Sequence, residues 1–139
     1  MTEAAWNVLP VRIYYEDTDA QGVVYFANYQ RFMERGRTEW LRANKVEQDV
    51  LRRDHGLIFS LTTANVRYHK PAQLDQQVVV CTRVSQIKGV RVTFEQEVRL
   101  GDEQGPLLAS AENVAASLDA ETLKPRRLLP ELQQMLLRQ

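Results

Sequence analysis

One long stretch with a helical repeat, followed by several stretches with a strand repeat, constrains this fold most. From about Ala27 to Asn44, apolar residues recur at helical spacing, and charged residues fill the positions between them. After Gly56, apolar and β-branched stretches alternate with short turn signals. Helix and strands are segregated along the chain, and this order is typical of an α+β fold with a mostly antiparallel sheet.

The helical stretch is expected to cover about 16 residues and to end near Asn44. Gly36 lies on its apolar stripe, where glycine weakens a helix but allows a sheet to approach closely. A stripe this long needs cover, so we expect the helix to lie across the sheet. The stripe consists of Tyr29, Phe32, Met33, Gly36, Trp40 and Leu41.

The strand-like stretches are separated by turn signals at Pro71, at Lys88-Gly89 and between Asp102 and Pro106. In the stretch 90–100, apolar and charged residues alternate, so one face is expected to be buried and the other wet. The expected strands are residues 11–15, 57–68, 77–87, 90–100 and 107–118, with a short helix at 48–54 and a terminal one from Pro130.

Length and charge narrow the class of protein. A chain of 139 residues fits one domain, taken here as residues 1–139. Lys plus Arg and Asp plus Glu number 18 each, so bulk charge offers no attraction to nucleic acid or to an anionic membrane. No apolar run approaches the roughly 20 residues of a membrane span. The N-terminal segment lacks a secretion-signal pattern and Cys81 is alone, so we expect a cytoplasmic protein.

The segment from Tyr14 to Tyr29 reads YYEDTDAQGVVYFANY and concentrates acids before a glycine. Read as a calcium loop from Asp17, it places Gly22 correctly, but its twelfth position is Asn28 where a bidentate Glu is required. Zinc is not expected either, because His55, His69 and Cys81 lack ligand spacing. We therefore expect no metal and no cofactor. The two histidines are expected at the surface or in local hydrogen bonds, and Cys81 in the core.

Two interpretations of the acids remain open on residue chemistry alone. In the first, Asp17 and Asp19 bond nearby backbone N–H groups and only shape a turn. In the second, Asp19 is a base or nucleophile just before a helix whose first N–H groups have no internal partner and can hold an oxyanion. An apolar wall of Val23, Val24, Tyr25 and Phe26 would then receive an acyl group. No serine elbow, HExxH or phosphate-binding glycine loop is present.

The segment VRIYYEDTDAQGVVYFANYQRFMERGRTEWLR resembles the signature of hotdog-fold thioesterases. It is most similar to the YbgC branch of the 4-hydroxybenzoyl-CoA thioesterase group, which is associated with the Tol-Pal envelope system. The similarity continues through NVRYHKPAQLDQQVVVCTRV, QIKGVRVTFEQEV and LKPRRLLP, and so covers nearly the whole chain. It implies a five-stranded antiparallel sheet around one long helix, and homodimers or dimers of dimers with the active site between subunits.

The resemblance also implies an activity and its residues. The activity is hydrolysis of acyl-CoA or acyl carrier protein thioesters. Asp19 is then the nucleophile or general base, and the backbone N–H of Phe26 holds the thioester oxygen. Residues expected around the acyl group and loop are Tyr15, Gly22, Val23, Tyr25 and Tyr29. Cations expected for coenzyme A phosphates are Lys70, Lys88, Arg91, Arg126 and Arg127.

The sequence departs from the branch at Phe26, where its members usually carry His. A backbone donor does not depend on the side chain, so Phe26 still fits the oxyanion role. The departure favours the alternative of a non-catalytic hotdog module that binds acyl carrier protein or an envelope partner. Hotdog dehydration is a weaker alternative, because His55 and His69 lie away from the acidic loop. Glu34, on the helix, is the candidate for a helix-borne carboxylate, although a surface ion pair suits it better.

Overall fold

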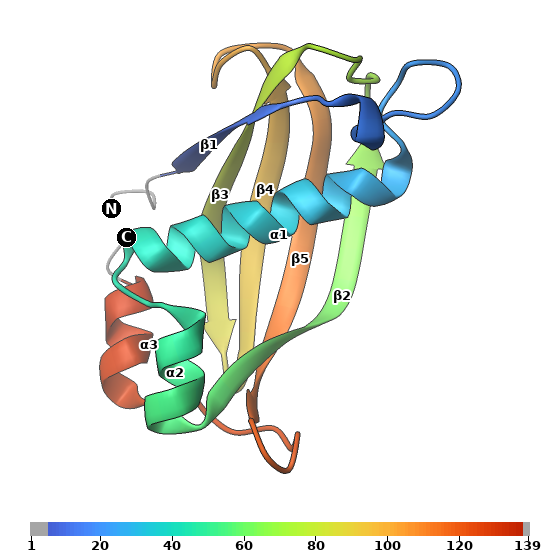
Figure 1. Cartoon of the computed structure of the whole chain (residues 1–139). Coiled ribbons are helices and arrows are strands. Elements are labelled where there is room, and N and C mark those ends of the chain that lie inside the picture. The colour runs from blue at the N-terminus through green and yellow to red at the C-terminus, as the bar shows by residue number, and fades with distance from the viewer. Residues whose placement is uncertain (1–5, 138–139) are drawn as a thin grey trace.

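The computed structural model describes residues 6–137, which form a curved antiparallel sheet with one long helix against its inner face (Figure 1). The sheet order is β1-β3-β4-β5-β2, and every neighbouring pair is antiparallel. This confirms the predicted five-stranded hotdog arrangement. The elements are β1 (Asn7–Arg12), a 3-10 turn (Tyr15–Asp17), α1 (Phe26–Ala43), α2 (Gln48–His55), β2 (Leu57–Tyr68), β3 (Gln77–Lys88), β4 (Arg91–Leu100), β5 (Leu107–Asp119) and α3 (Pro130–Leu137).

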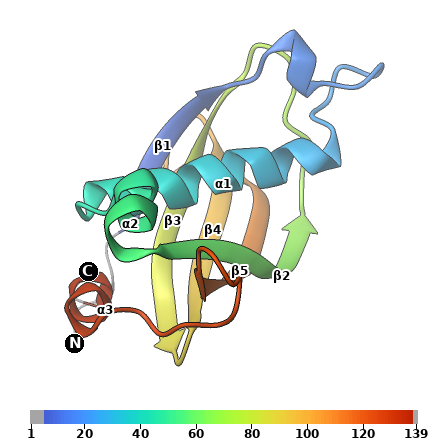
Figure 2. The same cartoon turned by 60° about the horizontal axis from the view of Figure 1, so that its bottom comes forward.

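Helix α1 crosses the sheet, and α2 and α3 lie toward its C-terminal end (Figures 1 and 2). Its 18 residues bury the predicted stripe, and Asn28 is buried at the start of the same face. At the other end, the Asn44 side chain donates to the Trp40 carbonyl and closes the last turn. One core cluster, around Phe32 and Met33, lies under the first half of α1, and a second lies under Trp40.

Gly36 allows α1 to approach the sheet closely, as its place on the stripe predicted. A Cβ at this position would lie 2.6 Å from Thr82 Oγ1 and 2.8 Å from Val80 Cγ1. The buried Gln96 side chain also lies beside Gly36. Its Nε2 donates a hydrogen bond to the Met33 carbonyl of α1 at 2.8 Å. The helix is thus fixed to the sheet by hydrogen bonds in addition to apolar contact.

The first strand differs from the prediction of residues 11–15. It spans Asn7–Arg12, and the chain turns at Tyr15. The Tyr14 N–H donates to Asp17 Oδ2 at 2.8 Å, so the local turn takes the donor that a longer strand would use. Pro10 is tolerated earlier because β1 is an edge strand, where a missing N–H costs no ladder bond.

The other elements agree with prediction to within one or two residues. Gly56 adopts the left-handed conformation that stops α2, and Gly89 does the same in the β3–β4 turn. Strand β2 forms the second edge of the sheet and is exposed along most of its length. Within residues 6–137, no helix is long and apolar enough to cross a membrane.

Candidate active site

The acidic segment folds back on itself directly before α1. The Asp19 N–H donates to the Val23 carbonyl at 2.9 Å, and the Gly22 N–H donates to the Asp19 carbonyl at 3.0 Å. Gly22 has a φ of +79°, which favours glycine and closes this tight turn. A bridge between Val23 and Gln73 ties the turn to the segment before β3. The sequence therefore builds a short, backbone-fixed loop that presents Asp19 at its surface.

The two aspartates of this loop have different environments. Asp17 is held by its neighbours: Oδ2 accepts the Tyr14 N–H, and Oδ1 lies 3.4 Å from Asn28 Nδ2. Asp19 accepts one bond, from the Gln21 N–H to Oδ1 at 2.8 Å. Within the described part of the chain, its Oδ2 has no partner, and the residue is exposed. Asp17 is a structural acid, whereas Asp19 retains a free carboxylate oxygen.

The start of α1 provides a free donor near this loop. Within residues 6–137, no oxygen accepts the N–H of Phe26, and no side chain caps the helix. The first turn contains no acid that would occupy the positive end of the helix. The preceding Tyr25 N–H is taken by the Asp17 carbonyl at 3.0 Å, which joins the loop to the helix start. The arrangement thus offers a carboxylate and an unused main-chain donor on one connected segment.

Aromatic side chains gather beside the helix start. The rings of Phe26 and Tyr68 have centroids 4.8 Å apart, and those of Tyr29 and Tyr68 are 5.3 Å apart. The Tyr29 hydroxyl accepts the Ala72 N–H at 3.1 Å, and burial raises the pKa of this phenol. Tyr68 was not among the sequence-predicted residues. The sequence signal for it was a large aromatic residue at the end of an expected strand, and the structure leaves its side chain 44% exposed.

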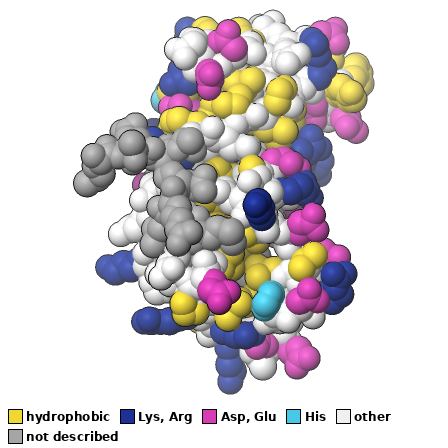
Figure 3. Space-filling view, turned by 90° about the vertical axis from the view of Figure 1, so that its left-hand side faces the viewer, with side chains coloured by type: hydrophobic (Ala, Val, Ile, Leu, Met, Phe, Trp, Pro, Cys, Tyr) yellow, Lys and Arg dark blue, Asp and Glu magenta, His cyan; other side chains and the backbone are white. Residues whose placement is uncertain are grey.

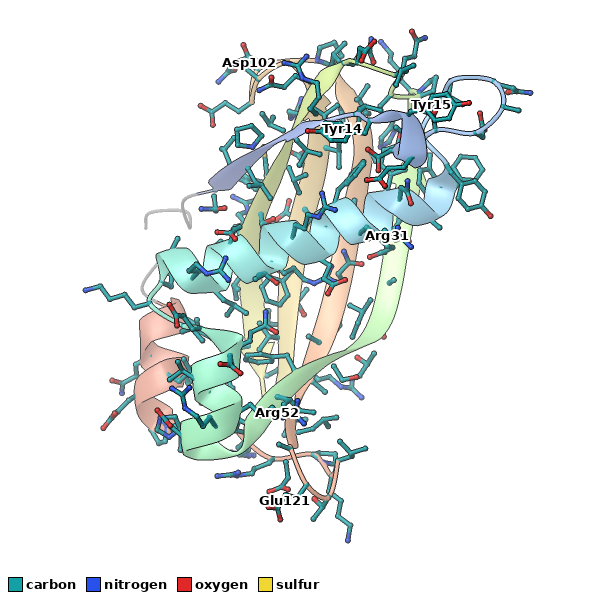
Figure 4. All side chains as sticks on the ribbon, in the orientation of Figure 1. Tyr14, Tyr15, Arg31, Arg52, Asp102 and Glu121 are labelled. Carbon is teal, nitrogen blue, oxygen red and sulfur yellow. The ribbon has the colours of Figure 1, made fainter. Side chains whose placement is uncertain are left out.

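The predicted apolar wall is only partly present in one chain. Val24 is 3% exposed and belongs to the core under α1, so it does not face a substrate. Tyr15, Tyr25 and Phe26 are instead strongly exposed, and Val23 is partly buried. Figure 4 places Tyr15 where β1 gives way to the acidic loop. These side chains form an open rim around the helix start.

The predicted cations are dispersed. Lys70 follows β2 and is exposed, two residues before Ala72, whose carbonyl accepts the Val24 N–H. Lys88 and Arg91 face each other across the β3–β4 turn, at the end of the sheet away from the acidic loop (Figure 1). Arg126 is engaged by the carbonyls of His55 and Gly56, at 3.0 and 3.2 Å, and Arg127 is exposed. Of these five predicted cations, Lys70 alone lies in the region of Asp19 within one chain.

Other candidates take structural roles or remain at the surface. His69 lies at the surface as predicted, and its Nε2 is 3.0 Å from Ser110 Oγ on the neighbouring strand β5, while Cys81 is buried. Glu34 is exposed. Burial lowers the pKa of the Arg37 guanidinium, and the negative charge of Glu34 offsets part of that lowering. Among the described residues, no cluster of three His, Cys, Asp or Glu is placed to hold a metal. Acidic and basic side chains are interspersed over the face shown in Figure 3.

A long helix against a five-stranded antiparallel sheet, with an exposed carboxylate just before the helix, is the arrangement expected of a hotdog-fold thioesterase. Comparison with known proteins agrees with this class. The model of the thioesterase-like superfamily matches residues 14–136. The chain belongs to that family.

Individual relatives are similar over most of their length. The chain is 40% identical over 119 residues to the acyl-CoA thioester hydrolase YbgC of Escherichia coli, covering 86% of this chain and 87% of the relative. It is 41% identical to the acyl-CoA thioesterase YbgC of Haemophilus influenzae, covering 84% and 83%. A solved structure of a probable thioesterase from Bartonella henselae superposes with a TM-score of 0.82 at 35% identity, covering 90% of this chain and all of that one.

Proposed function

We propose that this protein hydrolyses acyl-CoA thioesters, with Asp19 as the reacting carboxylate and the Phe26 N–H as the oxyanion donor. The observation that carries this proposal is that one connected segment presents a carboxylate oxygen and a helix-start N–H, neither of which has a hydrogen-bond partner among residues 6–137. Family membership supports the reaction class, and the names of the curated relatives support coenzyme A as the thiol carrier.

The proposed chemistry uses charge that develops during attack on the thioester. The carbonyl oxygen becomes negative as the tetrahedral intermediate forms, and the Phe26 N–H at the positive end of α1 stabilises that charge. A preorganised donor of this kind contributes about 2.7–4 kcal/mol to lowering the barrier. The donor belongs to the backbone, so the Phe26 side chain is free to pack against Tyr68.

Two routes use the same geometry. In the first, Asp19 Oδ2 attacks the carbonyl, the thiolate leaves and takes up a proton, and water then hydrolyses the acyl-aspartyl anhydride. In the second, Asp19 takes a proton from water, the resulting hydroxide attacks, and the same proton passes to the departing sulfur. A single turnover in ¹⁸O-labelled water separates them. In the anhydride route, water that attacks the aspartyl carbonyl leaves an unlabelled Asp19 oxygen in the carboxylic acid released by the first turnover. In the general-base route, the same carboxylic acid carries ¹⁸O from the water.

The proposal includes a second copy of the chain. In one chain, the rim of Tyr15, Tyr25 and Phe26 is exposed, and the outer edge of β2 has no strand partner within residues 6–137. Pairing two β2 edges satisfies the free backbone groups of an edge strand. Lys88 and Arg91 belong to the coenzyme A site only through such a pairing, because one chain holds them far from Asp19.

A substrate panel tests the proposed function. Purified protein is mixed with acyl-CoA and acyl carrier protein thioesters of graded chain length, and released thiol is measured. We expect turnover of acyl-CoA, with specific activity falling when dilution separates the subunits, as followed by sedimentation velocity. Absence of turnover with every thioester, together with a stable complex with acyl carrier protein, would establish the non-catalytic alternative. The cytoplasmic location is part of this proposal, since the reaction requires access to coenzyme A thioesters.

A further inference from the structure

A groove runs along α1, between the helix and the inner face of the sheet near β2. Its volume is about 310 Å³, and its apolar side is lined by Leu41, Phe59, Leu61 and Phe94. Gln30 lies at the end of the groove nearest the helix start. It follows Phe26 by four residues, which is about one helical turn or 6 Å along α1. The groove therefore begins one turn beyond the proposed oxyanion donor.

The hydrogen bonds beneath α1 fix which way the Gln30 amide points. Gln96 donates through Nε2 to the Met33 carbonyl, which only accepts, so Gln96 Oε1 must face the other way. That oxygen accepts Asn113 Nδ2 at 2.8 Å and Arg37 Nη1 at 3.0 Å. Asn113 therefore turns its own oxygen toward Gln30.

The end of this chain of amides is an acceptor without a donor. Gln30 Nε2 donates to Asn113 Oδ1 at 3.3 Å. Within residues 6–137, Gln30 Oε1 is buried and accepts no hydrogen bond. Buried acceptors are rarely left unpaired, and an unpaired one calls for an explanation. Flipping the amide would oppose two oxygens at Asn113, so the orphan cannot be removed in that way.

We propose that Gln30 determines substrate specificity, because its Oε1 accepts a hydrogen bond from a hydroxyl group on the acyl chain. The inference rests on the proposed function and names the acyl class it prefers. The hydroxyl lies about one helical turn, or 6 Å, from the thioester carbonyl, since that is the offset between Phe26 and Gln30. The terminal torsion of glutamine is soft, so a modest rotation turns Oε1 toward the groove. Unsubstituted acyl chains leave the acceptor unpaired.

Three matched substrates test this inference: hexanoyl-CoA, 6-hydroxyhexanoyl-CoA and 3-hydroxyhexanoyl-CoA. For the wild type, kcat/KM for the 6-hydroxy compound is expected to exceed that for hexanoyl-CoA at least about tenfold. The 3-hydroxy compound is expected to show no such gain, because its hydroxyl lies too near the carbonyl. In Gln30→Leu the preference should vanish. Thr38→Val is the control, since Thr38 lines the groove further along α1 and should leave the preference intact.

The readout is a ratio within one protein, so a loss of folded protein in Gln30→Leu lowers both rates and leaves the ratio unaffected. Calorimetric binding of the same compounds to Asp19→Asn provides the preference without turnover. A tenfold binding preference for the 6-hydroxy compound, lost in Asp19→Asn/Gln30→Leu, supports the inference even where the wild type hydrolyses nothing and the proposed function fails. Equal use of hexanoyl-CoA and 6-hydroxyhexanoyl-CoA, or a preference that survives Gln30→Leu, overturns it.

Discussion

Asn28 donates a hydrogen bond from its side-chain Nδ2 to the backbone oxygen of Asp17, across 3.0 Å. Asn28 is 7% exposed and lies in the first turn of α1, while Asp17 lies two residues before Asp19. The contact therefore connects the helix start, which carries the Phe26 N–H, to the loop that carries the proposed reacting carboxylate. The relative position of the two proposed groups depends on this link.

Replacing Asn28 with Asp tests the link, because it puts a carboxylate against the carbonyl and carboxylate of Asp17. We expect the free energy of unfolding to fall by about 1–3 kcal/mol, since a buried hydrogen bond is lost. We expect kcat to fall by at least about tenfold, because small misplacements of reacting groups slow catalysis strongly. Urea unfolding and steady-state kinetics measure the two effects. Asn28→Ser keeps a smaller donor, so its stability and kcat should lie between those of the wild type and those of Asn28→Asp. Wild-type stability and kcat in Asn28→Asp would refute the link.

Gly36→Ala tests the contact between α1 and the sheet. Alanine favours a helix over glycine by about 1 kcal/mol, so propensity alone predicts a stabilised protein. The new Cβ meets Thr82 Oγ1 and Val80 Cγ1 at distances below 3 Å, so we expect a net destabilisation of about 1–3 kcal/mol. Urea unfolding measures the sign. Arg35→Ala, on the exposed face of the same helix, should change stability by no more than about 0.5 kcal/mol.

The contrast between Gly36 and Asn28 shows what the sequence predicts and what it does not. Gly36 could be assigned to a helix–sheet contact because the helical repeat places it on the buried stripe. The helix and the strands after it follow from the same local periodicity, and the antiparallel sheet follows from their segregation along the chain. The Asn28–Asp17 bond joins residues 11 positions apart across a loop. The loop has no periodic pattern, so the sequence does not predict this bond.

Other features depend on contacts between segments that lie far apart in sequence. Tyr68 reaches Phe26 only because the end of β2 lies beside the start of α1. The first strand ends early because the Tyr14 N–H is taken by a side chain three residues on. The sequence predicts Val24 in the apolar wall of the acyl pocket, but in the structure its side chain packs in the core. Gln30 shows its unpaired oxygen only once the partners of Gln96 and Asn113 are known.

Cys81 should be unreactive while the protein is folded. It is 3% exposed, and burial, reinforced by the charge of Glu97, raises the pKa of its thiol to about 11. Because the thiolate is the reactive form, we expect no labelling by a thiol reagent at pH 8 in the native state and one labelled thiol after unfolding. Rapid labelling of the native protein would contradict the buried position of this strand residue.

The raised pKa of Cys81 also predicts a pH dependence of stability. The native state holds the thiol proton up to about pH 11, whereas the unfolded state releases it near the ordinary value of 9.0. Between these values the unfolded state binds fewer protons, so stability from this group is complete below about pH 9 and declines toward pH 11. The difference in unfolding free energy between wild type and Cys81→Ala, followed from pH 8 to pH 10.5, isolates this contribution. A difference that stays constant would contradict the shift.

The central claim is that Asp19 supplies the reacting carboxylate, and kcat of Asp19→Asn for an acyl-CoA tests it most directly. Asparagine keeps an oxygen to accept the Gln21 N–H, so the loop should persist and the unfolding midpoint should stay unchanged. The matched control is Glu16→Gln, which removes an exposed acid three residues earlier. We predict a fall in kcat of about 10²–10⁴-fold for Asp19→Asn and wild-type kcat for Glu16→Gln. Wild-type kcat in a folded Asp19→Asn would contradict the account.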